Sequence, residues 1–148
     1  MKIVNHTVGL FVVVFLLIGG ELQAQNQNLL KVYNPIPIKH NKTIQDKLSL
    51  EDIPTGEGGF ARDYYIHLVA GDQIVIDLTS DEFDTVVTLM KDDGTTIGEN
   101  DDGPDGTTNS LLFTRIVEDG KYIVRVSSFA LTGSGNFNLR VTKLQEVE

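Results

Sequence analysis

The stretch from Asp63 to Leu78, D-Y-Y-I-H-L-V-A-G-D-Q-I-V-I-D-L, contains two runs in which apolar and polar residues alternate. The apolar positions are Tyr64, Ile66 and Leu68 in the first run and Ile74, Ile76 and Leu78 in the second. A period of two is the pattern of a β-strand that buries one face. Ala70-Gly71-Asp72, between the runs, offers the positive-φ position that a tight hairpin needs. The stretch therefore predicts two strands joined by a short turn.

The same alternation recurs on both sides of a long acidic segment, and Gly and Asp separate the runs. The further strands are expected around Val87 and Leu89, at Leu111 to Ile116, at Tyr122 to Val126 and at Phe137 to Val141. Their turns are Asp92-Asp93-Gly94, Asp119-Gly120 and Gly133-Ser134-Gly135. Short strands at this spacing predict an all-β antiparallel β-sandwich of about eight strands. The only helical turn we expect is at Leu48 to Ile53.

The N-terminal region differs from the rest of the chain in composition. Residues 1–24 resemble a secretory signal peptide, with Lys2 near the start, an apolar run over 8–18 and Leu22-Gln23-Ala24 before the expected cleavage point. A retained N-terminal anchor is the alternative. Residues 25–42 are polar and contain Pro35 and Pro37, so we expect an extended tether with one edge strand near Lys31 to Tyr33. The folded domain is expected over 43–144, followed by a tail at 145–148.

The charge of the chain is concentrated in one segment. The formal net charge is −9, and Asp81 to Asp105 holds nine carboxylates against the single base Lys91, a net of −8. An acidic surface disfavours binding to nucleic acid or to anionic lipid. The chain has no Cys, so neither disulfide bonds nor thiolate chemistry is available to it.

The acidic segment predicts a calcium site. Calcium takes six to eight oxygen ligands from carboxylates, amides and backbone carbonyls on a flexible loop. The expected ligands are Asp84, Asp101, Asp102 and Asn109, with Asn100 and Asp105 in reserve. The loop is not an EF-hand, because the twelfth position counted from Asp101 is Leu112 and not Glu. The alternative is a solvated loop in which the Asp and Asn side chains cap turns.

Two other kinds of site find little support. The sequence contains no G-x-S-x-G or H-E-x-x-H motif, and His67 is expected on the outer face of a strand. Sugar-binding sandwiches stack the sugar on exposed aromatic rings, but this chain has no Trp. Tyr65 is the one tyrosine expected to face outward from the domain, and we interpret it as a cross-strand packing residue.

Several short motifs, taken in order, resemble the bacterial pre-peptidase C-terminal domain. They are Thr43-Ile-Gln-Asp-Lys-Leu, Asp63-Tyr-Tyr, Ala70-Gly-Asp-Gln-Ile-Val-Ile-Asp-Leu, Phe83-Asp-Thr, Glu99-Asn-Asp-Asp-Gly, Thr108-Asn-Ser and Gly120-Lys-Tyr-Ile-Val-Arg-Val. The resemblance implies a jelly-roll-like sandwich that serves exported peptidases as an accessory module. It also implies similarity in architecture to the clostridial collagen-binding domain, whose relatives can hold calcium. Val86 and Met90 stand where family members often carry Tyr, which argues against an aromatic binding face.

These observations favour an exported, non-catalytic, calcium-stabilised module that acts in the periplasm or outside the cell. No catalytic domain accompanies it in this sequence, so we expect it to bind or assist a separate secreted protein or an extracellular polymer. We expect no nucleic-acid partner and no membrane association after signal cleavage. The sequence does not specify an oligomeric state. The alternatives are a small secreted hydrolase that uses His67 and a structural surface protein without a ligand.

Overall fold

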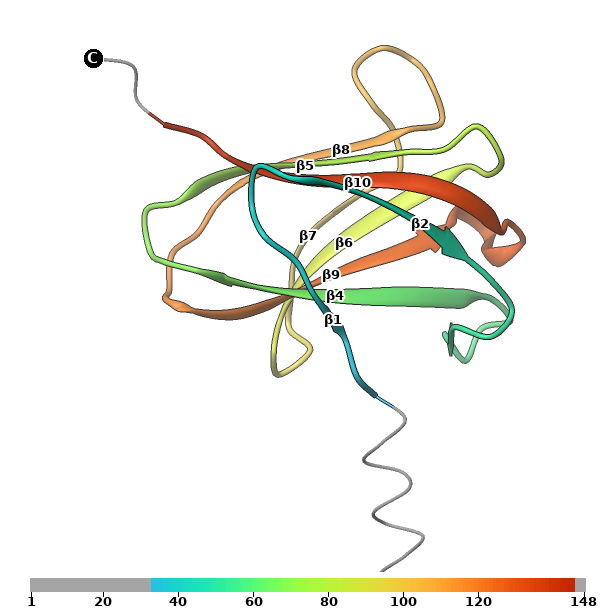
Figure 1. Cartoon of the computed structure of the whole chain (residues 1–148), viewed down its shortest axis with the longest axis horizontal. Helices are drawn as coiled ribbons and strands as arrows, with labels where there is room; N and C mark the ends of the chain where they lie inside the picture. The colour runs from blue at the N-terminus through green and yellow to red at the C-terminus, as the bar shows by residue number, and fades with distance from the viewer. Residues whose placement is uncertain (1–32, 146–148) are drawn as a thin grey trace, which may run out of the picture. The chain divides into compact units, whose positions relative to one another are not determined.

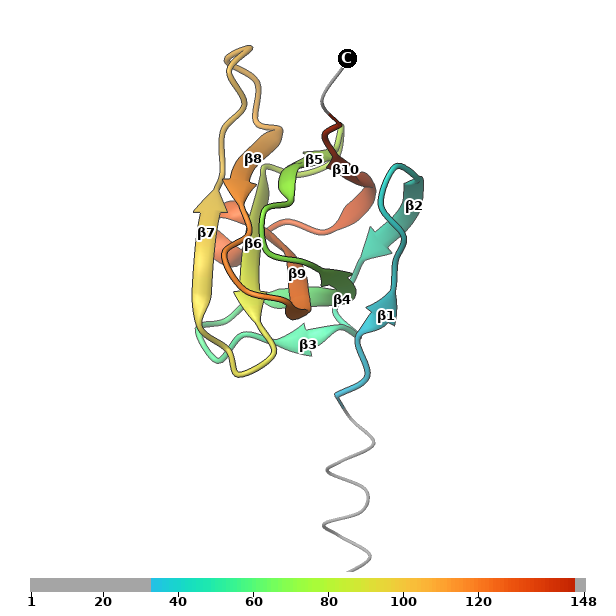
Figure 2. The same cartoon turned by 90° about the vertical axis from the view of Figure 1, so that its left-hand side faces the viewer.

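The computed structural model describes residues 33–145, which form a sandwich of two β-sheets (Figures 1 and 2). The first sheet, sheet A, has the strand order β1-β4-β9-β6-β7, and β3 also pairs with β4. Its strands are β1 (Ile36–Pro37), β3 (Ile53–Pro54), β4 (Phe60–Leu68), β6 (Thr85–Lys91), β7 (Thr96–Asn100) and β9 (Gly120–Ser128). The second sheet, sheet B, has the order β2-β10-β5-β8. Its strands are β2 (Thr43–Leu48), β5 (Gln73–Thr79), β8 (Ser110–Arg115) and β10 (Gly135–Lys143).

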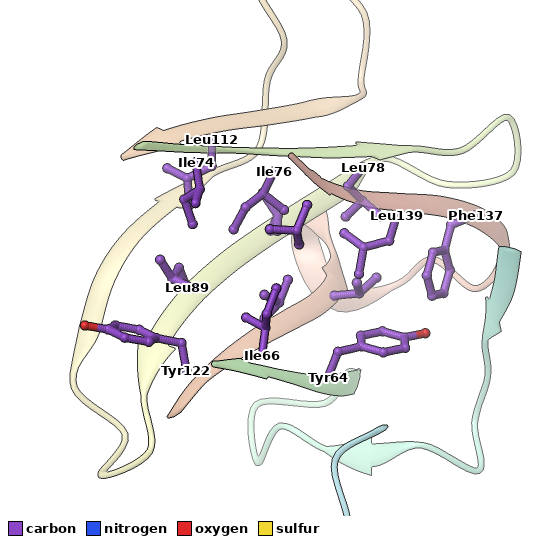
Figure 3. Packing of buried hydrophobic residues seen from close by; sticks show 14 of the residues in the cluster. Tyr64, Ile66, Ile74, Ile76, Leu78, Leu89, Leu112, Tyr122, Phe137 and Leu139 are labelled. Carbon is purple, nitrogen blue, oxygen red and sulfur yellow. The ribbon is translucent and has the colours of Figure 1, made fainter. Parts of the chain in front are cut away.

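The predicted β-sandwich is confirmed, and the alternating residues form its core. The alternating residues face inward and are at most 3% exposed: Tyr64, Ile66 and Leu68 of β4 in sheet A, and Ile74, Ile76 and Leu78 of β5 in sheet B. Figure 3 shows those of them that it labels packed between the sheets with Tyr122 of β9 and with Phe137 and Leu139 of β10: Tyr64, Ile66, Ile74, Ile76 and Leu78. Full burial of one aliphatic side chain of this kind contributes roughly 1.5–3 kcal/mol to folding. The core therefore follows from the period of two in the sequence.

The turn between β4 and β5 is present, but it does not form a hairpin. Gly71 has the expected positive φ of 95°. However, β4 pairs with β9, while β5 pairs with β10 and β8, so the turn carries the chain from one sheet to the other. Of the turns expected from the sequence, Asp92-Asp93-Gly94 does close a hairpin, between β6 and β7. A strand buries its apolar face against the opposite sheet whether or not its neighbour in the chain is its hydrogen-bonded partner. The alternation therefore does not distinguish a hairpin from a crossing between sheets.

Three local expectations differ from the structure. The segment around β7, Thr96–Asn100, is a strand that the alternation did not predict. Residues 50–52 form a turn, and no helix lies between Leu48 and Ile53. The edge strand of the expected tether is Ile36–Pro37, and it pairs in parallel with β4. The expected signal peptide and residues 25–32 of the expected tether lie outside the described residues.

The segment that follows β1 links the two sheets along one side of the sandwich. The Ile38 amide donates to the Tyr65 carbonyl in sheet A over 3.0 Å. The Asn41 amide then donates to the Val141 carbonyl in sheet B over 2.7 Å. Ile38 is half-buried against the core. Within residues 33–145, no helix is long and apolar enough to cross a membrane.

Candidate functional site

The topology brings two of the three connections of the acidic segment to one end of the sandwich. Leu78, near the end of β5, pairs with Ser110 at the start of β8, while Thr85 at the start of β6 pairs with Ser128 at the end of β9. The connections β5–β6, β7–β8 and β9–β10 therefore lie at the same end, which we call the loop end. The loop over residues 101–109 stands out from the sandwich there (Figures 1 and 2). All four calcium ligands expected from the sequence belong to connections at the loop end.

A buried knot of hydroxyl groups joins the β5–β6 and β7–β8 connections. The Thr85 hydroxyl lies 2.7 Å from the Ser110 hydroxyl and 3.1 Å from the Thr108 carbonyl. The Ser110 hydroxyl in turn donates to the Thr85 carbonyl over 2.8 Å. Thr85 and Ser110 are 0% and 1% exposed. The Phe83-Asp-Thr and Thr108-Asn-Ser motifs thus have a structural role that the sequence did not reveal, which is to fix two loops relative to each other.

Two of the four expected calcium ligands lie together in a hollow of about 480 Å³. Asp84 and Asn109 line it, along with Asp81, Glu82 and the hydroxyl-bearing Ser80, Thr107 and Thr108. The Asn109 side-chain oxygen accepts a bond of 2.9 Å from the Ser80 amide. This bond uses one of the two lone pairs of that oxygen. Phe83 also lines the hollow, and the carboxylates, hydroxyls and the Asn109 amide supply oxygen atoms of the kind that calcium takes as ligands.

The other two expected ligands lie outside this hollow. Asp101 and Asp102 follow the end of β7, at the base of the projecting loop. Of the reserves, Asn100 donates to the Leu111 carbonyl over 2.7 Å, and Asp105 accepts from the Thr107 hydroxyl over 2.8 Å. Among the described residues, no three Asp, Glu, His or Cys side chains converge as a metal-holding group. The oxygen donors of the four expected ligands suit calcium chemically, but the structure does not bring all four to one point.

A second feature of the loop end is a polar groove of about 450 Å³ on the outer face of sheet B. Its walls carry amides, hydroxyls, one ammonium group and carboxylates; the lining residues include Gln45, Lys47, Thr79, Asp81, Glu82, Asn136 and Asn138. Ser80, Asp81 and Glu82 line both the groove and the hollow. The β5–β6 turn is therefore the wall between the two.

The Glu82 side chain anchors this wall to β10. Its Oε1 atom accepts a bond of 2.6 Å from the Asn136 side chain. That bond lowers the pKa of the Glu82 carboxyl, because it favours the ionised form. An ideal Cβ on Gly135 would lie 2.5 Å from the Glu82 Cβ, so the turn and β10 approach each other closely. Sequence reasoning missed the groove, since its residues come from three distant segments.

An ionic clamp joins the sheets at the same end of the molecule. Asp46 of β2 accepts bonds from the Arg62 guanidinium over 2.9 Å and from the Tyr64 hydroxyl over 2.8 Å. Arg62 also reaches Asp52 over 2.6 Å. Figure 3 shows the Tyr64 hydroxyl pointing out of the apolar cluster. The sequence did contain a signal for this clamp. Asp46 alternates in phase with Ile44 and Leu48, so its carboxylate is on the inward face of its strand, where a charged group needs a partner.

Hydrogen bonding and burial act in opposite directions on the clamp residues. Burial favours the neutral Asp46 carboxyl, but the bonds from the Lys47 amide, Tyr64 and Arg62 outweigh it and lower the pKa of Asp46. Burial of the Tyr64 hydroxyl, together with its bond to Asp46, raises the pKa of Tyr64 well above its ordinary value. Burial disfavours the charged Arg62, but the two carboxylates outweigh it and raise the pKa of Arg62. Asp46 and Arg62 are therefore charged near neutral pH, while the Tyr64 hydroxyl keeps its proton.

The residues expected to be on the outer face of sheet A are there. His67 is exposed, and its ring packs edge-on against that of Tyr65 with 6.0 Å between centroids. The Lys121 ammonium lies 5.2 Å from the centre of the Tyr65 ring. Tyr65 therefore packs against its neighbours across the strands. Within the described chain, the contact with Tyr65 is the only side-chain interaction of His67 in the structure, so no serine–histidine–acid arrangement is formed there.

Fold and loop end together define a two-sheet β-sandwich module in which the motifs at the strand ends have structural roles. Residues 61–128 match the model of the family described as the bacterial pre-peptidase C-terminal domain. The resemblance of the sequence motifs to this family is thereby confirmed over residues 61–128.

Solved structures of two bacterial proteins share the fold. The pre-peptidase C-terminal domain of a collagenase from Bacillus anthracis aligns with a TM-score of 0.56 at 16% identity, over 74% of this chain and 95% of that one. PliG of Aeromonas hydrophila, a periplasmic inhibitor of g-type lysozyme, aligns with a TM-score of 0.55 at 15% identity, over 75% of this chain and 96% of its own. No curated protein sequence matches the chain.

Proposed function

We propose that this chain is an exported binding module that is stabilised by calcium and assists a secreted protein. The observation that carries the proposal is the shared wall at Ser80 to Glu82, which separates the acidic hollow from the polar groove. A cation held on one side of this wall would order the surface on the other side. The signal-like residues 1–24 and the domain family support export.

The proposed calcium ligands are Asp84, Asp101, Asp102 and Asn109. A bound calcium ion would supply positive charge to a region where like charges otherwise repel. Asp84 and Asn109 already line one hollow, on opposite loops that the hydroxyl knot holds in place. Asp101 and Asp102 belong to the projecting loop, so in this proposal binding draws that loop towards the hollow.

The proposed partner site is the groove on sheet B. Gln45 and Lys47 make no side-chain hydrogen bond to the rest of the described chain, so their polar groups are available to a ligand. Asp81 likewise has no side-chain partner in that part of the molecule. Donors and acceptors in one groove suit a polar segment of a folded protein or an extended peptide. An extracellular polymer is the alternative partner.

Calcium binding can be tested by thermal melts of residues 25–148 in EDTA and in calcium. A ligand at ten times its Kd stabilises the folded state by about 1.4 kcal/mol, which is roughly 4–8 °C in a small domain. We expect this rise in the parent protein, and its loss in Asp84→Asn and in Asp101→Asn/Asp102→Asn. The matched control is Asp92→Asn, a carboxylate at the opposite end that pairs with Lys121 over 2.9 Å. An equal rise in all four proteins, or no rise in the parent, would contradict the proposed site.

Partner binding needs a separate readout. The tagged protein is used to capture ligands from the secreted fraction of its host, with calcium or with EDTA. We expect the Lys47→Glu variant to lose the partner that the parent captures. Thr142→Glu, on the same face of β10 but outside the groove, is the control and should retain it. Equal capture by both variants would exclude the groove, and capture of a polysaccharide but no protein would favour the alternative partner.

The rival hydrolase makes a different prediction. It requires His67 as a base, yet the imidazole is exposed and packs against Tyr65. His67→Ala should therefore leave every property of the protein unchanged except the local packing. Any hydrolytic turnover that this variant abolishes would overturn the non-catalytic assignment.

A further inference from the structure

The chain contains four Asp-Gly steps, at Asp93, Asp102, Asp105 and Asp119. Such a step can rearrange without an enzyme. The backbone nitrogen of the glycine attacks the aspartate Cγ atom, a water molecule leaves, and a five-membered succinimide forms. Water then reopens the ring, either to aspartate or to isoaspartate, so that the net mass is unchanged. Glycine permits the attack because it has no Cβ to obstruct it.

The reaction needs a carboxyl group and a neighbouring amide that are both free to approach each other. A carboxylate that accepts hydrogen bonds is held away from the attack, and an amide that donates one is held in its turn or strand. The four steps can therefore be ranked by the contacts of these two groups, and three of them are restrained.

At the β6–β7 hairpin, the Asp93 side chain accepts from the Thr95 amide over 2.9 Å, and the Gly94 amide donates to the Lys91 carbonyl over 2.9 Å. Both reacting groups are thus held by the turn that closes the hairpin. The backbone of this step is fixed as well, because Gly94 has a φ of 88°.

The step at Asp119 is restrained by the sheet. Its side chain accepts from the Ala70 amide over 2.7 Å, which ties it to the β4–β5 turn. Gly120 begins β9 and pairs with Leu68 of β4. A succinimide here would break a contact between two turns and distort the start of a central strand.

The step at Asp105 lies in the projecting loop but is also restrained. One oxygen of its side chain accepts from both the amide and the hydroxyl of Thr107, over 3.2 and 2.8 Å. The Gly106 amide donates to the Gly103 carbonyl over 3.3 Å. The local turn therefore occupies both of the groups that would have to react.

The step at Asp102 lacks both restraints. The Asp102 side chain is exposed and accepts no hydrogen bond from the described chain. Its own amide donates to the Asn100 side chain over 3.2 Å, which leaves the carboxyl group unaffected. The Gly103 amide has no hydrogen-bond acceptor within residues 33–145. Neither residue belongs to a strand.

We propose that Asp102 is the position at which this folded protein isomerises to isoaspartate. The product carries an extra methylene in its backbone and a carboxylate one atom closer to it. The rearrangement would thus displace a charge at the base of the projecting loop. The inference rests on the contacts of the Asp-Gly steps and does not depend on whether the loop binds calcium.

The test is incubation of the protein at 37 °C and pH 7.4 in EDTA, followed by digestion and electron-transfer fragmentation. Trypsin releases residues 92–115 as one peptide that contains three of the steps, and fragmentation separates them by position. We expect isoaspartate to accumulate first and most at residue 102. The same incubation in 6 M urea removes the folded contacts and should spread the product over all four steps.

Two variants make the assignment specific. Asp102→Glu keeps the charge but cannot form the five-membered ring, so it should lose most of the isoaspartate of the folded protein. Asp105→Glu, three residues along the same loop, should leave that yield unchanged. The proposal is overturned if another step reacts first in the folded protein, or if the order of the four steps is the same in urea as in buffer.

Discussion

At the scale of single residues, the Thr85 hydroxyl is the group that joins two connections of the loop end. It is completely buried and bridges Ser110 and the Thr108 carbonyl. Thr85→Val keeps the shape but removes these bonds, so we expect a loss of about 1–3 kcal/mol in the free energy of unfolding. Urea denaturation measures it. Thr79→Val is the control, because its hydroxyl makes one long contact of 3.4 Å with Asn138. Equal losses in the two variants would show that the knot contributes little.

The Asp46 carboxylate should make stability depend on pH. Its pKa is lowered in the folded state, where the bonds from the Lys47 amide, Tyr64 and Arg62 outweigh burial. The stabilisation is therefore present at neutral pH and is lost as pH falls from about 4, the unfolded value, through the folded pKa. We expect Asp46→Asn to be about 1–2 kcal/mol less stable at pH 7 and to approach the parent as pH falls through the folded pKa.

Urea denaturation between pH 7 and pH 2.5 measures this difference without adding salt. Glu57→Gln is the matched control, because Glu57 is exposed and its carboxylate has no partner among the described residues. Its difference from the parent should stay near zero throughout. A constant gap between the parent and Asp46→Asn across the whole range would mean that the clamp does not depend on the charge of Asp46.

At the scale of elements, the segment after β1 is expected to stabilise the sandwich although the sequence suggested a tether. Ile38 is half-buried against the core, whereas Ile36 in β1 is 36% exposed. Ile38→Ala should lower the free energy of unfolding by about 1–2 kcal/mol through lost burial. Ile36→Ala should change it by less than about 0.5 kcal/mol. Thermal melts of both variants compare them directly, and indistinguishable midpoints would restore the tether interpretation.

The strands could be predicted from the sequence where one face is fully buried. Tyr64 to Leu68 and Ile74 to Leu78 alternate cleanly because each faces the opposite sheet. Their partners could not be predicted, since a turn at Gly71 serves a hairpin and a crossing between sheets equally well. The strand Thr96–Asn100 was missed because it is a short edge strand, and its Gly98 lies against Leu112 instead of presenting a side chain.

The candidate site could be predicted only to the extent that topology determines it. Asp84 and Asn109 flank strand ends that the sandwich brings to one end, so their meeting in the hollow follows from the strand order. Asp101 and Asp102 depend on the path of a long loop, which is set by local turns such as the bond from the Asp102 amide to Asn100. The groove combines side chains from β2, β5 and β10, and no short window of sequence contains it.

At the scale of the whole molecule, the fold divides the acidic segment into parts. Six of its nine carboxylates lie in the connections of the loop end: Asp81, Glu82, Asp84, Asp101, Asp102 and Asp105. Asp92 and Asp93 lie in the β6–β7 hairpin at the opposite end, and Glu99 accepts from Thr88 on sheet A over 2.7 Å. The loop end is therefore the part of the surface where repulsion between like charges is strongest.

This distribution predicts that simple salt stabilises the protein. The screening length falls from about 30 Å at 0.01 M salt to about 8 Å at 0.15 M, which is short enough to separate neighbouring loops electrostatically. We expect the midpoint of thermal unfolding to rise with NaCl in EDTA. Asp101→Asn/Asp102→Asn/Asp105→Asn should rise less steeply, because fewer charges remain to be screened.

The control for this salt effect is Asp92→Asn/Asp93→Asn. It removes charge from the hairpin, where Asp92 already pairs with Lys121, so its salt dependence should stay close to that of the parent or become steeper. Adding millimolar calcium in a background of 0.5 M NaCl then separates specific binding from screening, since screening is already nearly complete at that ionic strength. A midpoint that falls with NaCl in the parent would show that attractive pairs such as Lys121–Asp92, and not repulsion at the loop end, dominate the electrostatics of this fold.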